Sequence, residues 1–361
     1  MKKILTALLL CFFLFNLAGS VYADKTIRYR NAKTLGMGDT RIAGGFGYNG
    51  FVDNPALLSR VGIVRFSILN LPVTINKNLV DIGKFIDENS DKFESYDDLT
   101  IEEKDNFIKD LQKHDAKWGR VIVSPMVDIA ANIKGYGVGL AVFNTSDVSL
   151  KMDRGIYEPR VWGEGINNTV AVLGIAKPVF FFYPGLTVGV NLKYFQRRHA
   201  SLFQIPASNL GNFDETVDPI IDEATNKQST FAMDIGTLLE IPAINAEIGA
   251  TIQSIGDGRG SSIDIGIAKR MASNRLVLLA DYIDFFDNNK ENFFNKIHMG
   301  AQYKYAVFAL RAGFNSGYPT IGLGLNSRVI DIDAAYYIEE LSKGPGGNDE
   351  PRFIVQIKLG W

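Results

Sequence analysis

The chain has 361 residues, 46% of them hydrophobic, with 35 glycines and a formal net charge of −2. This near-neutral charge gives no basis for nucleic-acid binding. The single cysteine, Cys11, lies in the predicted export signal, so the mature chain has no thiol for catalysis, disulfides or Cys-based zinc sites. No later stretch has the roughly 20 apolar residues that a membrane-spanning helix needs. With these classes excluded, the composition is compatible with two kinds of protein, a soluble β-protein or a membrane β-barrel.

Residues 1–23 have the pattern of a secretory signal peptide. Lys2 and Lys3 form a charged start, Ile4–Phe15 is apolar, and Val21-Tyr22-Ala23 supplies a small-residue cleavage site. A membrane-spanning helix is the alternative, but the apolar run is short and the cleavage pattern follows at once. The sequence therefore predicts an exported protein.

Residues 24–60 follow as a segment too short and too rich in glycine to be a domain. Asn54 can accept a hydrogen bond from the first amides of a helix, and Pro55 suits the first helical position. We expect a short helix there, inside a compact segment that needs an enclosure. The glycines either allow positive φ and movement of the segment or form tight turns in a fixed plug; they are Gly36, Gly38, Gly44, Gly45, Gly47 and Gly50.

Two motifs in this segment carry a family resemblance. Leu35-Gly36-Met37-Gly38, followed after a spacer by Asn54-Pro55-Ala56-Leu57, resembles the N-terminal hatch of the FadL-like outer-membrane transporters of long-chain fatty acids and other hydrophobic compounds. The resemblance implies a hatch over residues 24–60 that plugs a 14-stranded barrel formed by residues 61–361. It also implies that Asn54, Pro55 and Ala56 anchor the hatch.

The same resemblance implies a location and partners. The location is the outer membrane of a Gram-negative-type bacterium, and the partners are outer-membrane lipids, the barrel assembly machinery and a hydrophobic small molecule. The motif is similar in the PorV-like branch, whose members serve protein secretion. The function that the resemblance implies is therefore a channel for passive uptake of hydrophobic small molecules such as long-chain fatty acids, and a secretion-associated partner or scaffold protein is the alternative.

The remaining chain reads as an all-β, antiparallel transmembrane barrel. Alternating runs predict about fourteen strands, an even number, as bacterial single-chain outer-membrane barrels require. The predicted strands are Val61–Leu71, Arg120–Ile133, Gly135–Thr145, Asn167–Lys177, Gly185–Arg198, Thr230–Ile241, Asn245–Ser254, Ser262–Met271, Arg275–Ile283, Lys296–Tyr305, Ala306–Phe314, Tyr318–Asn326, Val329–Glu339 and Arg352–Trp361.

The connections between these strands sort by length. Long polar connections, such as Ser146–Ile166 and His199–Ser229, alternate with short ones, such as Lys134 and Ser327-Arg328. Long extracellular loops and tight periplasmic turns are typical of this barrel class, whereas a soluble sandwich with one wet face has no reason to sort its loops.

Within the strands, apolar residues alternate with polar residues or glycine, which predicts lipid outside and a polar, crowded lumen inside. We expect the charges that face the lumen to pair with one another more often than they bind a ligand; these are Asp234, Glu247, Asp264, Arg270, Arg311, Asp331, Asp333 and Lys358.

The longest insertion, residues 72–119, is predicted to be an extracellular loop with two amphipathic helices. Thr100 and Glu103 form a capping box before the second helix. Apolar side chains spaced for one helical face either create a groove that admits a ligand or pack over the barrel rim; they are Leu79, Ile82, Phe85, Ile86, Phe107, Ile108 and Leu111.

No residue pattern indicates an enzyme, a metal site or a cofactor. The three histidines include His298, which is predicted to face the lumen rather than the membrane-facing position that a barrel phospholipase needs. The Gly45–Gly50 stretch fits GxGxxG but lacks the preceding strand and following helix of a dinucleotide site. Gly256–Gly260 is too short and has too few acidic residues for an EF-hand.

The last predicted strand ends in an aromatic residue. Phe353, Leu359 and Trp361 lie on its apolar face, and this ending resembles the C-terminal signal by which outer-membrane barrels are recognised for assembly. The alternative is an ordinary interfacial tryptophan.

Overall fold

A computed structural model describes residues 28–44, 48–112, 117–153, 159–179, 184–206, 228–257, 261–288, 292–342 and 348–361. The predicted signal peptide and the glycines Gly45 and Gly47 lie outside these ranges. Within them, no helix has the length and apolar content to cross a bilayer.

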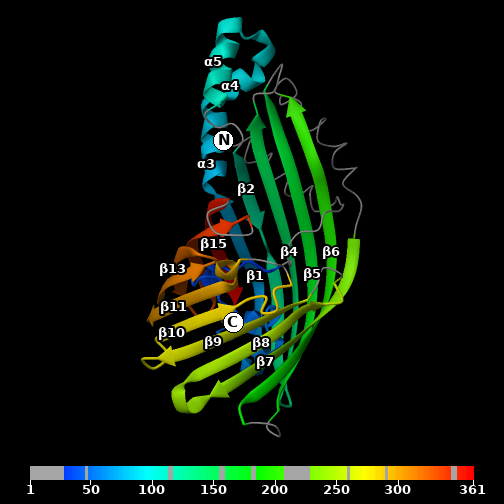
Figure 1. Ribbon diagram of the computed structural model, residues 1–361, viewed down its shortest axis with the longest axis vertical. Coiled ribbons are helices and arrows are strands. Elements are labelled where there is room, and N and C mark those ends of the chain that lie inside the picture. Colours follow the sequence, from blue (N-terminus) through cyan, green and yellow to red (C-terminus); the bar gives the residue numbers. More distant parts are fainter. Residues whose placement is uncertain are drawn as a thin grey trace.

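The strands form one antiparallel sheet that closes on itself, because β1 pairs with β15. From β4 to β15 each strand pairs with its neighbours in sequence, whereas β2 and β3 each pair with β1 and β4, and the closed barrel is drawn in Figure 1. The strands are β1 (Val64–Asn76), β2 (Trp118–Val123), β3 (Met126–Ile133), β4 (Tyr136–Asp153), β5 (Arg160–Pro178), β6 (Leu186–Pro206), β7 (Gln228–Ile241), β8 (Ala246–Ile255), β9 (Ser262–Met271), β10 (Leu276–Tyr282), β11 (Ile297–Tyr305), β12 (Phe308–Asn315), β13 (Tyr318–Asn326), β14 (Ile330–Glu340) and β15 (Asp349–Gly360).

The predicted barrel of about fourteen strands is confirmed, with one strand divided in two. β2 and β3 both lie between β1 and β4, and they replace the single predicted strand Arg120–Ile133. The division falls at Ser124-Pro125, because proline has no amide hydrogen for the ladder. The Ser124 amide donates to the Pro72 carbonyl at 3.1 Å, and the Pro125 carbonyl accepts from the Asn144 amide at 3.0 Å.

Three strands run further toward the long-loop end than the sequence predicts. β4, β5 and β6 have 18, 19 and 21 residues and include parts of the predicted loops Ser146–Ile166 and His199–Ser229. In Figure 1 they form a tall wall that rises above the shorter strands β7–β13. Their upper ends mix polar and apolar residues, and strands beyond the bilayer do not need a continuous apolar outer face, which is the pattern by which we located the others.

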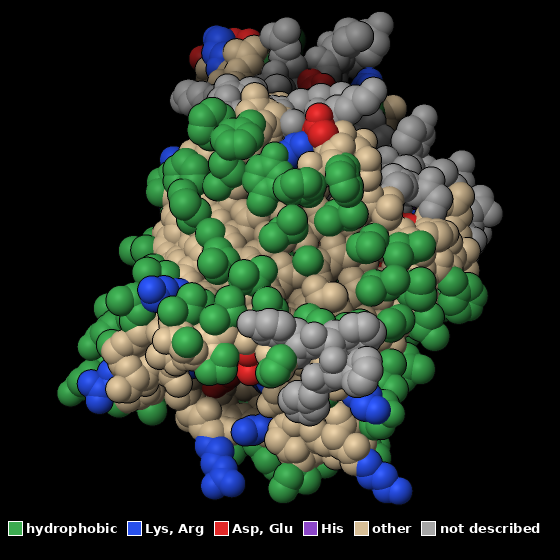
Figure 2. Space-filling model, turned by 60° about the horizontal axis from the view of Figure 1, so that its bottom comes forward, with side chains coloured by type: hydrophobic (Ala, Val, Ile, Leu, Met, Phe, Trp, Pro, Cys, Tyr) green, Lys and Arg blue, Asp and Glu red, His purple; other side chains and the backbone are tan. Residues whose placement is uncertain are grey.

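The predicted separation of faces is confirmed. On β15, Phe353, Val355 and Ile357 are exposed, whereas Arg352, Ile354 and Gln356 are buried. Large apolar side chains cover the outside of the barrel, as the green areas of Figure 2 show. An apolar outer surface around a polar interior is the arrangement of a lipid-embedded barrel, so the protein is an outer-membrane barrel of the Gram-negative type.

Several lumenal charges pair, as the sequence predicts. Arg311 Nη1 lies 2.8 Å from Asp333 Oδ1, and Arg270 Nη2 lies 3.1 Å from Glu247 Oε2. Other pairs use partners outside the predicted set: Lys193 with Asp234, Lys33 with Asp331, and Arg60 with Glu247.

The insertion after β1 contains α3 (Lys77–Glu88), α4 (Ser90–Glu94), the 3-10 helix η3 (Tyr96–Asp98) and α5 (Ile101–Leu111). The predicted capping box at Thr100 and Glu103 is confirmed. The insertion begins at Lys77 rather than residue 72, because β1 continues through Pro72 beside the break in the neighbouring strand.

Residues 28–60 form the N-terminal segment, which includes α2 (Ala32–Leu35) and the 3-10 helices η1 (Tyr48–Val52) and η2 (Pro55–Arg60). The other 3-10 helices, η5 (Pro242–Ile244) and η6 (Phe293–Lys296), connect strands. In the N-terminal segment, Leu35, Met37, Ile42, Phe51 and Leu57 are all buried. The segment therefore lies enclosed by the barrel.

Candidate functional site inside the barrel

Glycines on neighbouring strands provide bare backbone for the N-terminal segment to lie against. We call this set the glycine belt: Gly139, Gly174, Gly189, Gly236, Gly249, Gly266, Gly300 and Gly313. Its members pair across strands, Gly139 with Gly174, Gly189 with Gly236, Gly249 with Gly266, and Gly300 with Gly313.

The fit at the belt is close. A Cβ atom on Gly189 would lie 2.6 Å from the Pro55 carbonyl carbon, and one on Gly249 would lie 2.7 Å from the Ile42 carbonyl oxygen. Real Cβ atoms essentially never approach other atoms to less than 3 Å. The absence of side chains at the belt therefore lets the backbone of the segment lie directly against the wall.

Asn54 is the residue that ties the segment to itself and to the wall. Its side chain is fully buried and its Oδ1 accepts from the Ala56 amide at 3.1 Å, which caps η2. Its Nδ2 donates to the Ile42 carbonyl at 2.8 Å and to the Thr237 carbonyl on β7 at 3.1 Å. The predicted cap at Asn54-Pro55 is confirmed, as a 3-10 helix, and Ala56 and Leu57 pack against Leu238.

The Leu35–Gly38 motif lies against the shorter strands on the other side of the barrel. Leu35 packs in a cluster with Ala335, Tyr337 and Ile354, while Gly36 approaches Gly322 and Met37 approaches Gly300. This explains why Ile354 departs from the polar inward pattern of β15.

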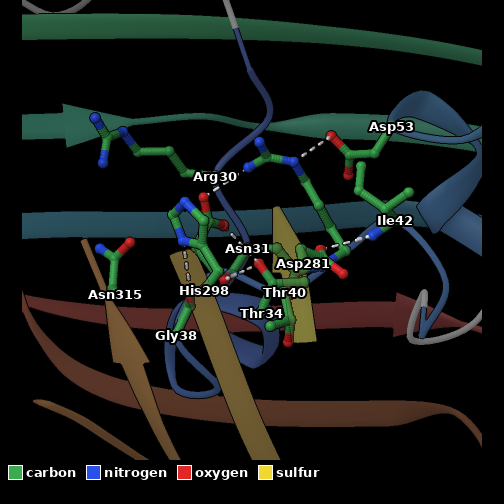
Figure 3. Close-up of polar contacts among 12 residues, drawn as sticks. Arg30, Asn31, Thr34, Gly38, Thr40, Ile42, Asp53, Asp281, His298 and Asn315 are labelled. Carbon is green, nitrogen blue, oxygen red and sulfur yellow. Dashed lines mark hydrogen bonds and ion pairs between the residues drawn. The ribbon is translucent and has the colours of Figure 1, made fainter. Parts of the chain in front are cut away.

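Gly38 is held by two side chains of the wall. It has a φ of 68°, which favours glycine, and its amide donates to Thr320 Oγ1 at 3.0 Å. His298 Nδ1 lies 2.8 Å from the Gly38 carbonyl oxygen, as Figure 3 shows. The predicted lumenal direction of His298 is confirmed.

Asp281 on β10 binds the backbone of the segment at Arg41 and Ile42. Its Oδ2 accepts from the Arg41 amide at 2.6 Å and from the Ile42 amide at 3.0 Å, and Figure 3 shows it beside Ile42. The Arg41 guanidinium donates to Asp39 at 2.6 Å and lies 3.8 Å from Asp53. Burial raises the pKa of Asp53 to about 6, although the nearby Arg41 favours its ionised form.

Apolar packing holds the segment against the tall side of the barrel. Phe51, Leu58 and Tyr29 belong to one buried cluster with side chains of β3–β7, among them Phe143 and Phe195. The segment thus makes both apolar contacts and hydrogen bonds to the wall, and Arg30 also pairs with Glu339 at 2.7 Å.

The apolar residues predicted to admit a ligand form a compact cluster outside this lumen. Ile82, Phe85, Phe107 and Leu111 are buried with Met152 of β4, and Ile86 packs against them. Leu79 and Ile108 are partly exposed. The cluster holds the helices against the tall wall; its role as a point of ligand access stays a prediction.

The three residues of the predicted assembly signal lie at the closing seam of the barrel. Phe353 is exposed and contacts Tyr336, with ring centroids 5.0 Å apart, and Leu359 is partly exposed. Trp361 is half-exposed, and its ring centroid lies 4.4 Å from that of Phe66 on β1.

Sequence reasoning missed the wall residues of this site, namely the glycine belt, Asp281, Thr320 and the β7 carbonyl of Thr237. The available signal was the recurrence of inward glycines at matching heights of consecutive strands. It is weak in one sequence, since strand register must be known before the glycines can be paired.

Comparisons with solved structures give the same fold for known channels. The Pseudomonas putida toluene transporter TodX matches with a TM-score of 0.55 at 13% identity, over 92% of this chain and 98% of that chain. The Ralstonia pickettii toluene transporter TbuX matches with a TM-score of 0.54 at 14% identity, over 92% and 98%. No protein-family model and no curated protein sequence matches. The FadL-like fold that the motifs predict is therefore confirmed.

Proposed function

We propose that the protein is a passive outer-membrane channel for hydrophobic small molecules and that its N-terminal segment is the hatch that closes the lumen. The observation that carries this proposal is the seating of the segment on the glycine belt. The contact is close and, apart from the backbone link to β1, rests on noncovalent interactions such as the hydrogen bond from the Gly38 amide to Thr320. Such a plug can be displaced without unfolding the barrel.

The fold supports a hydrophobic cargo, since the neighbours TodX and TbuX are toluene transporters by name. Long-chain fatty acids, which the sequence resemblance implies, are the other candidate cargo. We propose no catalytic role, because the lumenal imidazole of His298 is engaged with the Gly38 backbone.

The break between β2 and β3 is the place where we propose that a hydrophobic molecule passes between lumen and bilayer. Here β1 changes register against β3 between Ser67 and Asn70 and against β15 between Ser67 and Leu69. Outside the break, Ile68 and Val127 are exposed. An apolar solute should pass from the lumen to the bilayer at the lowest free-energy cost where the wall has fewer ladder hydrogen bonds and its outer surface is apolar.

The test is uptake by proteoliposomes that contain the purified barrel. A fluorescent long-chain fatty acid and a monoaromatic hydrocarbon serve as the two probes, with a water-soluble sugar as the probe of leakage. Wild type should admit at least one hydrophobic probe faster than empty liposomes do, and exclude the sugar. Uptake equal to that of empty liposomes for both probes would refute a channel for these compounds.

A second candidate function has its own observation. The helices α3–α5 form an ordered body with its own buried cluster above a lumen that the segment occupies. This is the arrangement we expect of a secretion-associated partner or scaffold, as in the PorV-like branch. If the chain is a secretion-associated partner, deleting residues 78–116 and joining the ends should abolish co-purification of a partner from native membranes. If it is a channel only, no partner should co-purify with either form. The same deletion separates the two functions.

A further inference from the structure

A pocket of about 280 Å³ opens at the turn end of the barrel, beside the closing seam between β14, β15 and β1. Four of its lining side chains are cations: Arg60, Arg65, Arg328 and Lys358. One carboxylate, Asp331, also lines it. Figure 2 shows basic side chains along this turn-end face.

Neighbouring ion pairs leave the pocket positive. Lys33 Nζ lies 2.7 Å from Asp331 Oδ2, so the charge of the one lining carboxylate is already balanced from inside the lumen. Arg60 is held by Glu247 on the side away from the seam, at 2.5 Å. Arg65 and Arg328 are exposed and make no ion pair within the described residues. The pocket therefore presents uncompensated positive charge.

The edge of the same pocket is apolar and continues into the lipid-facing surface. Val329 and Trp361 line it and are each about half-exposed. The Trp361 ring packs against Phe66 at a tilt of 57°, and the neighbouring outward residues Ile330 and Ile357 are exposed. A cationic pocket with an apolar lip suits a molecule that has an anionic head and hydrocarbon chains.

We propose that this pocket binds the anionic head group of a phospholipid from the periplasmic leaflet. The phosphate would accept hydrogen bonds from Arg65 and Arg328, and the acyl chains would lie over Val329 and Trp361. The turn end of an outer-membrane barrel faces the periplasm, which places the pocket at that leaflet. The site lies at the seam and outside the glycine belt, and Arg60 of the N-terminal segment lines one side of it.

The experiment is native mass spectrometry of the full mature barrel in mild detergent, titrated with dioleoylphosphatidylglycerol. A one-to-one adduct should form, and dioleoylphosphatidylethanolamine should bind more weakly because its head has no net charge. Removing two cations with R65Q/R328Q should weaken the phosphatidylglycerol adduct about thirtyfold. Because Arg328 lies in an exposed turn, R328Q alone serves as a second variant if the double variant assembles poorly.

The matched control is K134Q/R275Q, which removes two exposed cations from other turns at the same end of the barrel. It should keep wild-type affinity. Unchanged binding by R65Q/R328Q, or an equal loss in the control, would overturn the assignment. Displacement of the lipid by glycerol phosphate at similar concentration would also overturn it, because the site would then be one for a soluble phosphate. Folding of every variant is checked by its heat-dependent gel mobility.

Discussion

Replacing Asn54 by alanine should loosen the N-terminal segment while the barrel stays assembled. The substitution removes a side chain that bonds η2, the Ile42 carbonyl and the Thr237 carbonyl together. It leaves the Ala56 amide and the Ile42 carbonyl without these partners in a buried place, and the Thr237 carbonyl without its partner in a part-buried one. Each buried group left unpaired costs roughly 1–3 kcal/mol, so the two buried groups cost about 2–6 kcal/mol of docking free energy.

Asn54→Asp is the matched variant, because it separates the two roles of the side chain. Aspartate keeps an acceptor for the Ala56 amide but places a carboxylate oxygen against the two carbonyls in place of their donor. It should therefore release the segment from β7 as strongly as Asn54→Ala does, although the cap of η2 is retained.

The assay is hydrogen exchange of the segment, followed by mass spectrometry of its peptides, together with uptake of the hydrophobic probe. A docking loss of 2 kcal/mol should speed exchange through segment opening about thirtyfold. Peptides from β10–β15 should exchange as in wild type, and uptake should rise. If exchange across residues 42–58 is unchanged in both variants while the barrel is intact, the proposed anchor is wrong.

Other predictions concern the belt, a buried acid and the last residue. Gly249→Val should cost about 1–3 kcal/mol of docking free energy and displace the segment, which new protease cleavage within residues 28–60 would reveal. Gly62→Val is the control, because a Cβ atom on Gly62 meets no atom within 4 Å. Equal cleavage of the two variants would contradict the role of the glycine belt. Because the pKa of Asp53 is raised to about 6 in the folded protein, its stabilising protonated form is lost as pH rises from about 4 to 6. Thermal unfolding of wild type should therefore show lower stability at pH 7 than at pH 5, and Asp53→Asn should flatten this difference; an unchanged pH profile would count against the burial. Deleting Trp361 should reduce folded barrel in the outer membrane, scored by gel mobility, through loss of the assembly signal. Phe66→Leu, which removes only the ring contact, should assemble normally if the signal reading is right.

The sequence alone determined the local features of the fold. Alternation along β15 and β12 predicted which residues face lipid, because side chains of a strand point to opposite sides in turn. Asn54-Pro55 predicted a helix start, since both residues act on the backbone within two positions. Thr100 and Glu103 predicted the start of α5 for the same reason.

Contacts between distant parts of the chain were decided only by the tertiary structure. Gly139 and Gly174 become neighbours through the register of β4 and β5, and Thr320 finds Gly38 across 282 positions of sequence. The break at Pro125 likewise could not be placed before the partner strands were known. Proline interrupts a strand only where a neighbouring strand would accept the amide hydrogen that proline lacks.

The N-terminal segment shows where this boundary lies. Its glycines and its Asn-Pro pair indicate a compact piece that needs an enclosure, but they do not specify which wall residues hold it. Asp281 and His298 have no local pattern that marks them, because the amides and the carbonyl that they bind belong to a segment more than 200 residues away. Short-range hydrogen bonds and alternation depend on residues that are close in sequence. Barrel closure and the position of the segment depend on strand register, which is fixed only when all the strands pair.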